Sequence, residues 1–407
     1  MSLTLKNSFM IFSILFFALF FFSKKLRNSQ TWQATVTPLA SIIGSGFLVS
    51  APLLILTTGQ WAPVMMIFIA IVAYLLGNAM RFNILHLEPL LVQSETSKFV
   101  TKLETLSRPI LGIAYIISVA FYLKLLSAFL LRGFSIDDPT LENTLTTSIL
   151  SFIAFVGWYR GLSMLEILET YAVNVKLIII LSMIVGHFVY NTNLFLHDSW
   201  SLSEHDHFTI VETTRKLLGI LIIVQGFETS RYMGQIYTPE MRIRTMRYAQ
   251  IISGIVYILF VGSAMVLFNN IHEVTEVAAI DLCRIVAPIL PFFLIIAALL
   301  SQFSAAVADT LGSAGLISEA TNKTVSMKLG IINVCLVGVI LTWSTNIYQI
   351  ITLASKAFAV YYFIQCLISA CLVIKAENDR FRLIKFSTYV LLIFLMTLVI
   401  LFSSSIE

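Results

Sequence analysis

The stretch IIGSGF at residues 42–47 decides how this chain is interpreted. It lies inside a long apolar segment, between Pro38 and Pro52. Its two glycines weaken a helix, because each costs about 1 kcal/mol relative to alanine. A helix interrupted inside a membrane persists only where the freed backbone groups line a cavity. The stretch therefore predicts a binding site at a broken helix, and close helix packing through small residues is the alternative.

A second stretch, VQGFETSR at residues 224–231, again places Gly-Phe in the middle of an apolar segment. It adds an acid and a base, and charges at this depth usually face a cavity or each other. Gly46 and Gly226 are 180 residues apart, and so are Lys176 and Lys356. The shared offset predicts two repeated units of five helices, the second inverted in the membrane.

The amino-acid composition indicates that this chain is embedded in a lipid membrane. Hydrophobic residues make up 58% of the chain, charged residues make up 12%, and the mean hydropathy is +0.90. A soluble domain carries about 25% charged residues. Apolar segments long enough to span a bilayer predict an all-α polytopic membrane protein with about twelve helices. The expected spans are 8–22, 34–54, 62–80, 109–131, 143–159, 167–190, 216–236, 248–268, 286–310, 329–343, 347–374 and 386–402.

Lysine and arginine are concentrated in alternate loops, and the other loops are acidic. This asymmetry predicts that the basic loops are cytoplasmic, as in a bacterial-type inner membrane protein. The net charge of +4 is then a topology signal and gives no indication of nucleic-acid binding. We expect an extra helix and basic linker (1–33), a first repeat (34–190), a second repeat (191–374), and a final turn and helix (375–407).

Motifs for catalysis and for cofactors are absent from the sequence. The four cysteines show no spacing typical of zinc, iron–sulfur or disulfide sites. No phosphate loop or nucleophile elbow is present. We therefore predict no enzyme activity, no cofactor and no metal. A membrane-embedded enzyme that uses Glu228 or Asp309 for acid–base chemistry is an alternative that lacks a nucleophile. His187 is expected at the outer surface.

Four segments resemble the amino acid–polyamine–organocation (APC) superfamily, whose fold is that of the bacterial leucine transporter. They are IGSGF (43–47), GFE (226–228), TPEMR (238–242) and VKL (175–177). Their order and spacing match over roughly residues 34–374. The chain has GQIY at 234–237, where the family usually has an acidic pair, so the subfamily and the substrate stay open.

The resemblance implies a secondary active transporter of amino acids or related small organic solutes that works by alternating access. It would be proton-coupled or an exchanger. A sodium-coupled symporter of the same fold and a transport-inactive sensor or scaffold are alternatives. The expected partners are a small-molecule substrate, protons and the lipid bilayer, without nucleic acid. The oligomeric state stays open.

Candidate site residues follow from the two interruptions and from the buried charges. Lys176 is the expected coupling group, because its amine can reach carbonyls freed near residues 42–44 or the hydroxyls of Ser301 and Ser304. Glu228 and Arg231 are three residues apart and are expected to form an ion pair. Lys124, Arg231, Asp309 and Lys356 are candidates for a polar network. The expected substrate-binding residues are Ile43, Gly44, Ser45, Gly46, Gln225, Gly226, Phe227 and Glu228.

Overall fold

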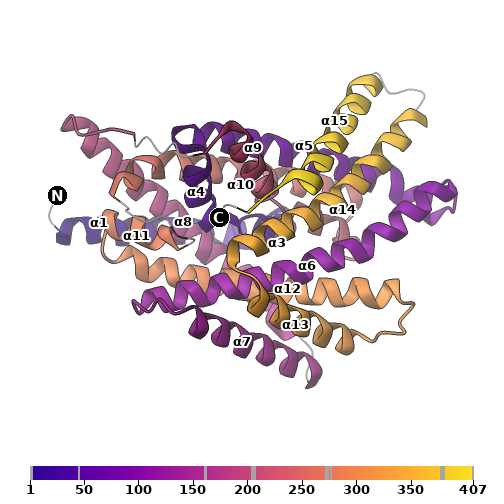
Figure 1. The fold of residues 1–407 in the computed structure, drawn as a ribbon, viewed down its shortest axis with the longest axis horizontal. Coiled ribbons are helices and arrows are strands. Elements are labelled where there is room, and N and C mark those ends of the chain that lie inside the picture. The colour runs from indigo at the N-terminus through magenta and orange to yellow at the C-terminus, as the bar shows by residue number, and fades with distance from the viewer. Residues whose placement is uncertain are drawn as a thin grey trace.

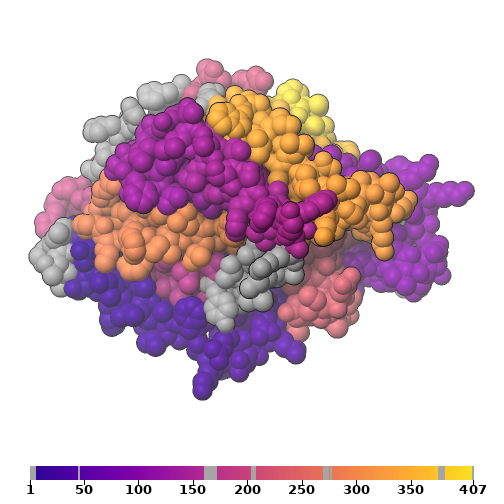
Figure 2. All heavy atoms as spheres, turned by 90° about the horizontal axis from the view of Figure 1, so that it is seen from below, coloured from indigo at the N-terminus to yellow at the C-terminus, as the bar shows by residue number. Residues whose placement is uncertain are grey.

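The computed structural model describes residues 3–44, 46–159, 163–202, 208–270, 275, 277–375 and 381–405. The described residues form helices and connecting turns, without a strand. Most long helices run along the horizontal axis of Figure 1, and α6 and α12 cross the molecule side by side. In the space-filling view, segments of the first half lie directly beside segments of the second half (Figure 2).

The first half of the chain contains helices of very different length, from the four residues of α2 to the 36 residues of α6. In order they are α1 (Leu3–Phe21), α2 (Lys24–Arg27), α3 (Gln30–Ile42), α4 (Gly46–Thr58), η1 (Gly59–Trp61), α5 (Ala62–Val92), α6 (Lys98–Gly133), α7 (Pro139–Tyr159) and α8 (Ser163–Leu196).

The second half starts with a short helix and a 3₁₀ segment. In order the elements are α9 (Ile210–Ile220), η2 (Phe227–Met233), α10 (Pro239–Ala264), η3 (Met265–Asn270), α11 (Ala278–Val286), α12 (Leu290–Ala320), α13 (Met327–Ser344), α14 (Ile347–Lys375) and α15 (Arg382–Phe402).

Hydroxyl side chains set the starts of several helices. In each case the oxygen of the residue before the helix accepts a hydrogen bond from a first-turn amide, which has no partner within the helix. At α9, Thr209 and Glu212 cap each other reciprocally, and at α10 Thr238 precedes a proline that suits the first turn. The capping residues are Ser29 (α3), Ser97 (α6), Thr209 (α9), Thr238 (α10) and Ser326 (α13).

Among the described residues, eight helical stretches are long and apolar enough to cross a membrane. The prediction of about twelve spans also counted segments that are short or split in the structure. Thus α3 has 13 residues and α9 has 11, and α4 and α5 together count as one stretch. The division into repeats 34–190 and 191–374 stays a prediction.

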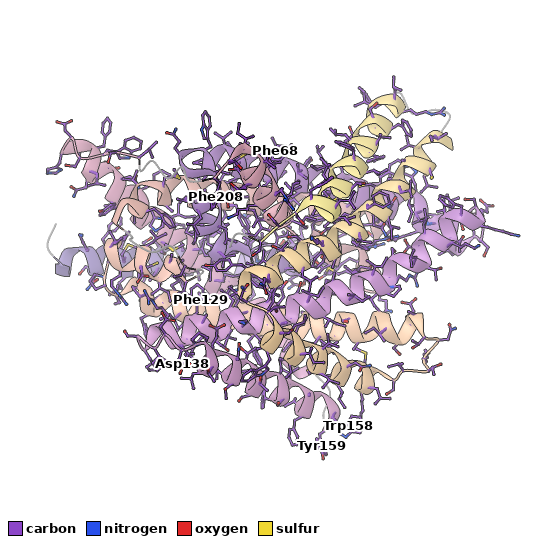
Figure 3. The ribbon with its side chains drawn as sticks, viewed as in Figure 1. Phe68, Phe129, Asp138, Trp158, Tyr159 and Phe208 are labelled. Atoms are coloured by element: carbon purple, nitrogen blue, oxygen red, sulfur yellow. The ribbon has the colours of Figure 1, made fainter. Side chains whose placement is uncertain are left out.

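Aromatic side chains mark an end of α7. Trp158 and Tyr159 project outward there, and Asp138 lies at the opposite end of the helix (Figure 3). Trp158 is 41% exposed and Tyr159 is 68% exposed. Exposed Trp and Tyr side chains are typical of membrane–water interfaces.

We name the two ends of the molecule by their charges. The start of α6 at Lys98 and the turn that contains Lys323 lie at the end on the right of Figure 1, called the basic end. Asp138 lies at the opposite, acidic end.

Candidate functional site

Two helices end close to one another inside the molecule. Helix α3 ends at Ile42 and α4 begins at Gly46. Helix α9 ends at Ile220, and the described residues 221–226 are not helical before η2 begins. We call the described residues 43–44 and 221–226 the first and second gaps.

The two gap regions pack closely at Gly46, which follows the first gap, and at Gly226, which ends the second. A methyl group added to Gly46 would lie 2.2 Å from the carbonyl oxygen of Ile223. A methyl group added to Gly226 would lie 2.5 Å from the hydroxyl of Ser41. Gly226 also has φ = +108°, in the left-handed region where side chains are disfavoured. In this structure Gly46 packs closely against Ile223, and its expected role in substrate binding stays a prediction. The adjoining Ser45 lies outside the described residues.

Side chains from three other helices satisfy carbonyls around the first gap. Lys176 of α8 donates to the carbonyl of Ala40 over 2.9 Å. Tyr257 of α10 donates to the carbonyl of Ile42 over 2.8 Å, and its hydroxyl is also 3.4 Å from the carbonyl of Ile223 in the second gap.

The carbonyl of Gly44 accepts from α12. The side-chain amide of Gln302 lies 3.1 Å from it, and the hydroxyl of Ser301 lies 3.5 Å from it. Buried carbonyls without partners are costly, so these donors make the first gap tolerable inside the protein.

The second gap is satisfied mainly by its own neighbours. The Glu228 carboxylate accepts from the amide of Gly226 over 2.9 Å. The Thr229 hydroxyl donates to the carbonyl of Gly226 over 2.7 Å. Tyr362 of α14 adds an outside contact, because its hydroxyl donates to Glu228 over 2.6 Å and its ring stacks on Phe227. The other Glu228 carboxylate oxygen is buried and has no hydrogen-bond partner among the described residues.

A cavity of about 700 Å³ opens at the basic end and ends at residues that adjoin the gaps. It is called the vestibule here. Ala40 and Ser41 of α3 and Thr229 beside the second gap line its inner part. Exposed residues such as Ile236 and Glu319 line its mouth. On the other side of the gaps α4 is closely packed, with Phe47, Val49 and Leu53 fully buried. The remaining lining residues used below are Tyr115, Tyr232, Ser304, Ala308, Asp309 and Gly315.

The predicted site residues separate into two groups in the structure. Ser304 and Asp309 line the vestibule. The described residues of the two gaps lie one layer deeper, next to lining residues: Ile43, Gln225, Phe227 and Glu228 are buried, as are Gly44, Gly46 and Gly226.

The two predicted network lysines lie on α6 and α14. Lys124 is buried and donates to the carbonyls of Thr342 and Thr345 over 3.2 and 2.8 Å. It thereby caps the end of α13, where a cation is favoured by the helix dipole. Lys356 is half-buried on α14.

The predicted ion pair between Glu228 and Arg231 is wrong. Arg231 instead forms ion pairs with Glu104 over 3.1 Å and Glu88 over 3.8 Å. Glu228 turns back to the amide of Gly226, a donor that the second gap leaves without a helical partner. The prediction assumed a continuous helix with both side chains on one face. In the structure each of the two charged groups instead contacts a different partner.

His187 is also not at the surface. It is fully buried, and its Nδ1 lies 3.2 Å from the hydroxyl of Ser263 on α10.

Sequence reasoning missed Tyr257, Gln302 and Tyr362, which hold the gap backbone and Glu228. Gln302 adjoins the predicted Ser301, and this proximity was the one signal in the sequence. Tyr257 and Tyr362 lie far along the chain from the residues they contact, so local pattern does not reveal them.

Comparisons with known proteins agree with this geometry. A family model described as "APC superfamily transporter" matches residues 24–403. An uncharacterized protein of Aquifex aeolicus (strain VF5) is 43% identical, over 100% of this chain and 98% of its own length.

Solved transporter structures share the fold at low sequence identity. A manganese transporter of Eremococcus coleocola is 11% identical, with a TM-score of 0.55 over 91% of this chain and 87% of its own. Mhp1, a nucleobase-cation-symport-1 family transporter, is 14% identical, with a TM-score of 0.55 over 91% of this chain and 92% of its own. The fold is thus the leucine-transporter-like fold predicted from the sequence, and the family model matched over residues 24–403 shows that the chain belongs to the APC superfamily of transporters.

Proposed function

We propose that this chain is a secondary active permease for amino acids or related small organic solutes, coupled to protons or working as an exchanger. It would lie in a bacterial-type inner membrane with the basic end in the cytoplasm. The substrate would bind where the two gaps meet and leave through the vestibule. Backbone groups freed at such gaps, together with half-helix dipoles, are suited to holding small charged or polar solutes.

The contact that carries the coupling proposal is the hydrogen bond from Lys176 to Ala40. Carbonyl and hydroxyl oxygens at this place would otherwise be able to hold a sodium ion. An amine placed among them supplies a positive charge that belongs to the protein. We therefore favour protons or exchange over sodium as the coupling mode.

A proton on the Lys176 amine would change the strength of this contact. The charged form makes a charge-assisted hydrogen bond to the carbonyl, which is about twice as strong as a neutral one. Gain or loss of the proton would tighten or loosen the link between α8 and α3. This gives a two-state element whose balance both substrate and protons can shift.

Uptake into proteoliposomes tests the proposal. Labelled amino acids and small organic cations are offered with a proton gradient, with a sodium gradient, and with unlabelled solute inside. We expect uptake that depends on the proton gradient or on internal solute. Uptake that requires sodium would replace the coupling proposal, and no uptake of any solute would favour a sensor or scaffold.

A further inference from the structure

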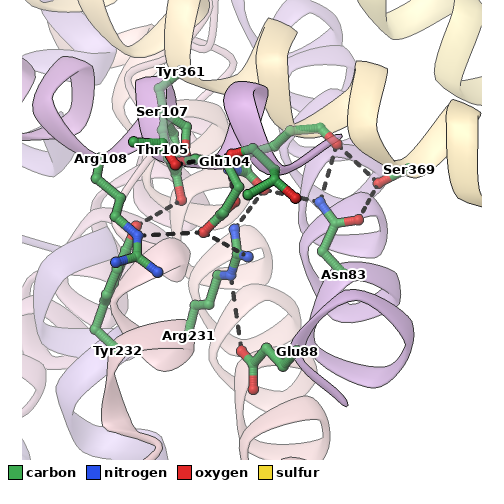
Figure 4. Close-up of polar contacts among 12 residues, drawn as sticks. Asn83, Glu88, Glu104, Thr105, Ser107, Arg108, Arg231, Tyr232, Tyr361 and Ser369 are labelled. Carbon is green, nitrogen blue, oxygen red and sulfur yellow. Dashed lines mark hydrogen bonds and ion pairs between the residues drawn. The ribbon is translucent and has the colours of Figure 1, made fainter. Parts of the chain in front are cut away.

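Arginine and glutamate side chains alternate in an unbroken series beside the vestibule, at the basic end of the molecule. Each charge lies within ion-pair distance of the next, and Figure 4 shows its central part around Arg231. We call this series the ion ladder. In order its members are Arg242, Glu88, Arg231, Glu104, Arg108 and Glu319.

The ladder connects two groups of helices. Arg242, Glu88 and Arg231 belong to α10, α5 and η2. The other three members belong to α6 and α12, which pack along each other. The pair between Arg231 and Glu104 is the step of the ladder that joins the two groups, and its charged atoms are 3.1 Å apart.

This joining pair is buried and has additional partners. The side chains of Arg231 and Glu104 are 4% and 7% exposed. Arg231 also donates to the side-chain oxygen of Gln365 over 2.6 Å, and the Gln365 amide donates to Ser107 over 3.1 Å. Buried charges are tolerated when paired and hydrogen-bonded, so the network strongly favours this one arrangement.

The segment held by the ladder is short. η2 lies between Gly226 and Gly234, and it carries two residues of the vestibule wall, Thr229 and Tyr232. Tyr115 of α6 lines the same cavity. A shift of η2 relative to α6 would therefore change the width of the vestibule.

We propose that Arg231 and Glu104 are positioning residues of the transport cycle. Their ion pair holds η2 beside α6 while the vestibule is open at the basic end, and the pair separates when the vestibule closes. The inference rests on the proposed function for the existence of a closed state, because alternating access requires one.

The test measures access to the vestibule and needs no substrate. Cysteines are introduced at two lining positions of α12, Ala308 in the deeper part and Gly315 nearer the mouth. A methyl group added to Gly315 meets no atom within 4 Å, so this cysteine is accommodated. Labelling by a neutral, water-soluble maleimide is timed for each, with the unsubstituted protein as background.

The variant that breaks the joining pair is Glu104→Gln. Arg231 then keeps Glu88 and Gln365 as partners, so its charge is not left alone. We expect labelling at Ala308→Cys to slow about tenfold, as for a modest shift between two states, while labelling at Gly315→Cys stays unchanged. Arg231→Lys, which keeps the charge but loses the fork of donors, should slow labelling at Ala308→Cys by a smaller factor.

The matched control is Asp281→Asn, which breaks the ion pair of Asp281 with Arg132 at the other end of α6. It should leave both labelling rates as they are. Unchanged labelling at Ala308→Cys in Glu104→Gln would overturn the proposal. Faster labelling at both positions would also overturn it, because the pair would then only stabilise the fold. If the labelling experiment contradicts the role of the ion pair, the result of the uptake experiment still stands. If no uptake is found, the labelling rates can still be interpreted, because they need no substrate.

Discussion

The backbone groups of the two gaps obtain their hydrogen-bond partners in different ways. Around the first gap, donors arrive from α8, α10 and α12, and Lys176, Tyr257 and Gln302 each come from a different helix. Around the second gap, Glu228 and Thr229 satisfy Gly226 from within two or three residues along the chain.

This difference indicates which gap is sensitive to the positions of the other helices. The backbone of the first gap depends on the placement of three other helices, so movement of any of them alters it. The second gap keeps most of its own hydrogen bonds, and η2 is positioned instead by the ion ladder. We infer that coupling acts through the first gap and gating through η2.

The largest expected effect comes from the backbone of the second gap. Gly226→Ala forces a side chain into a left-handed conformation and against Ser41. The conformational strain alone costs about 1–3 kcal/mol, and the contact adds to it. We expect a large drop in thermal stability in detergent and loss of uptake.

Gly262→Ala is the matched control for this change, because a methyl group there meets no atom within 4 Å. In a helix it should be neutral or stabilising by up to about 1 kcal/mol. Equal tolerance of both substitutions would show that the conformation of Gly226 is unimportant.

The next largest effect is expected for a substitution of Lys176, which contacts the backbone beside the first gap. Lys176→Met removes the donor to Ala40 while keeping much of the side chain's length and bulk. We expect uptake to fall by about tenfold or more, the change produced by about 1.4 kcal/mol. If Lys176 carries the coupling proton, substrate affinity varies with pH in the wild type and not in the variant. A pH dependence that survives the substitution rules this lysine out as the coupling group.

Two tyrosines allow the gaps to be compared by the same chemical change. Tyr257→Phe removes a hydroxyl that faces carbonyls at both gaps, Ile42 and Ile223. Buried acceptors left without a donor cost about 1–3 kcal/mol. Tyr362→Phe removes one donor to Glu228, which keeps the Gly226 amide. Thermal unfolding should show the larger loss for Tyr257→Phe, and the reverse order would contradict the assigned roles.

The smallest effect is expected at Ser301. Its hydroxyl is 3.5 Å from the Gly44 carbonyl, which Gln302 already supplies with a donor at 3.1 Å. Ser301→Ala should therefore change stability by no more than about 0.5 kcal/mol. Gln302→Leu should cost more, and equal losses would mean that Ser301 is the principal donor.

The sequence predicted the fold class because it depends on local pattern. Helix α9 ends at Ile220, ahead of the stretch 224–231 in which the sequence places an interruption. Long apolar segments and mid-span glycines are visible along the chain. The contact of Lys176 near the first gap was anticipated within a few residues, with Ala40 in place of residues 42–44.

Ion-pair and hydrogen-bond partners that depend on how the helices pack could not be predicted from local sequence pattern. Arg231 was assigned to Glu228 because only neighbours along a helix can be judged from spacing. Its partners Glu88 and Glu104 come from α5 and α6. His187 was placed at the surface because position in a span was the only guide, whereas contact with α10 buries it.

We propose that substrate binds where the two gaps meet and enters or leaves this place through the vestibule. Ser304 lines the vestibule close to the first gap, and Ser304→Cys changes little in shape. A solute identified by uptake should slow maleimide labelling of Ser304→Cys in a saturable way and leave Gly315→Cys at the mouth unaffected. Equal labelling of Ser304→Cys with and without saturating solute would contradict the claim.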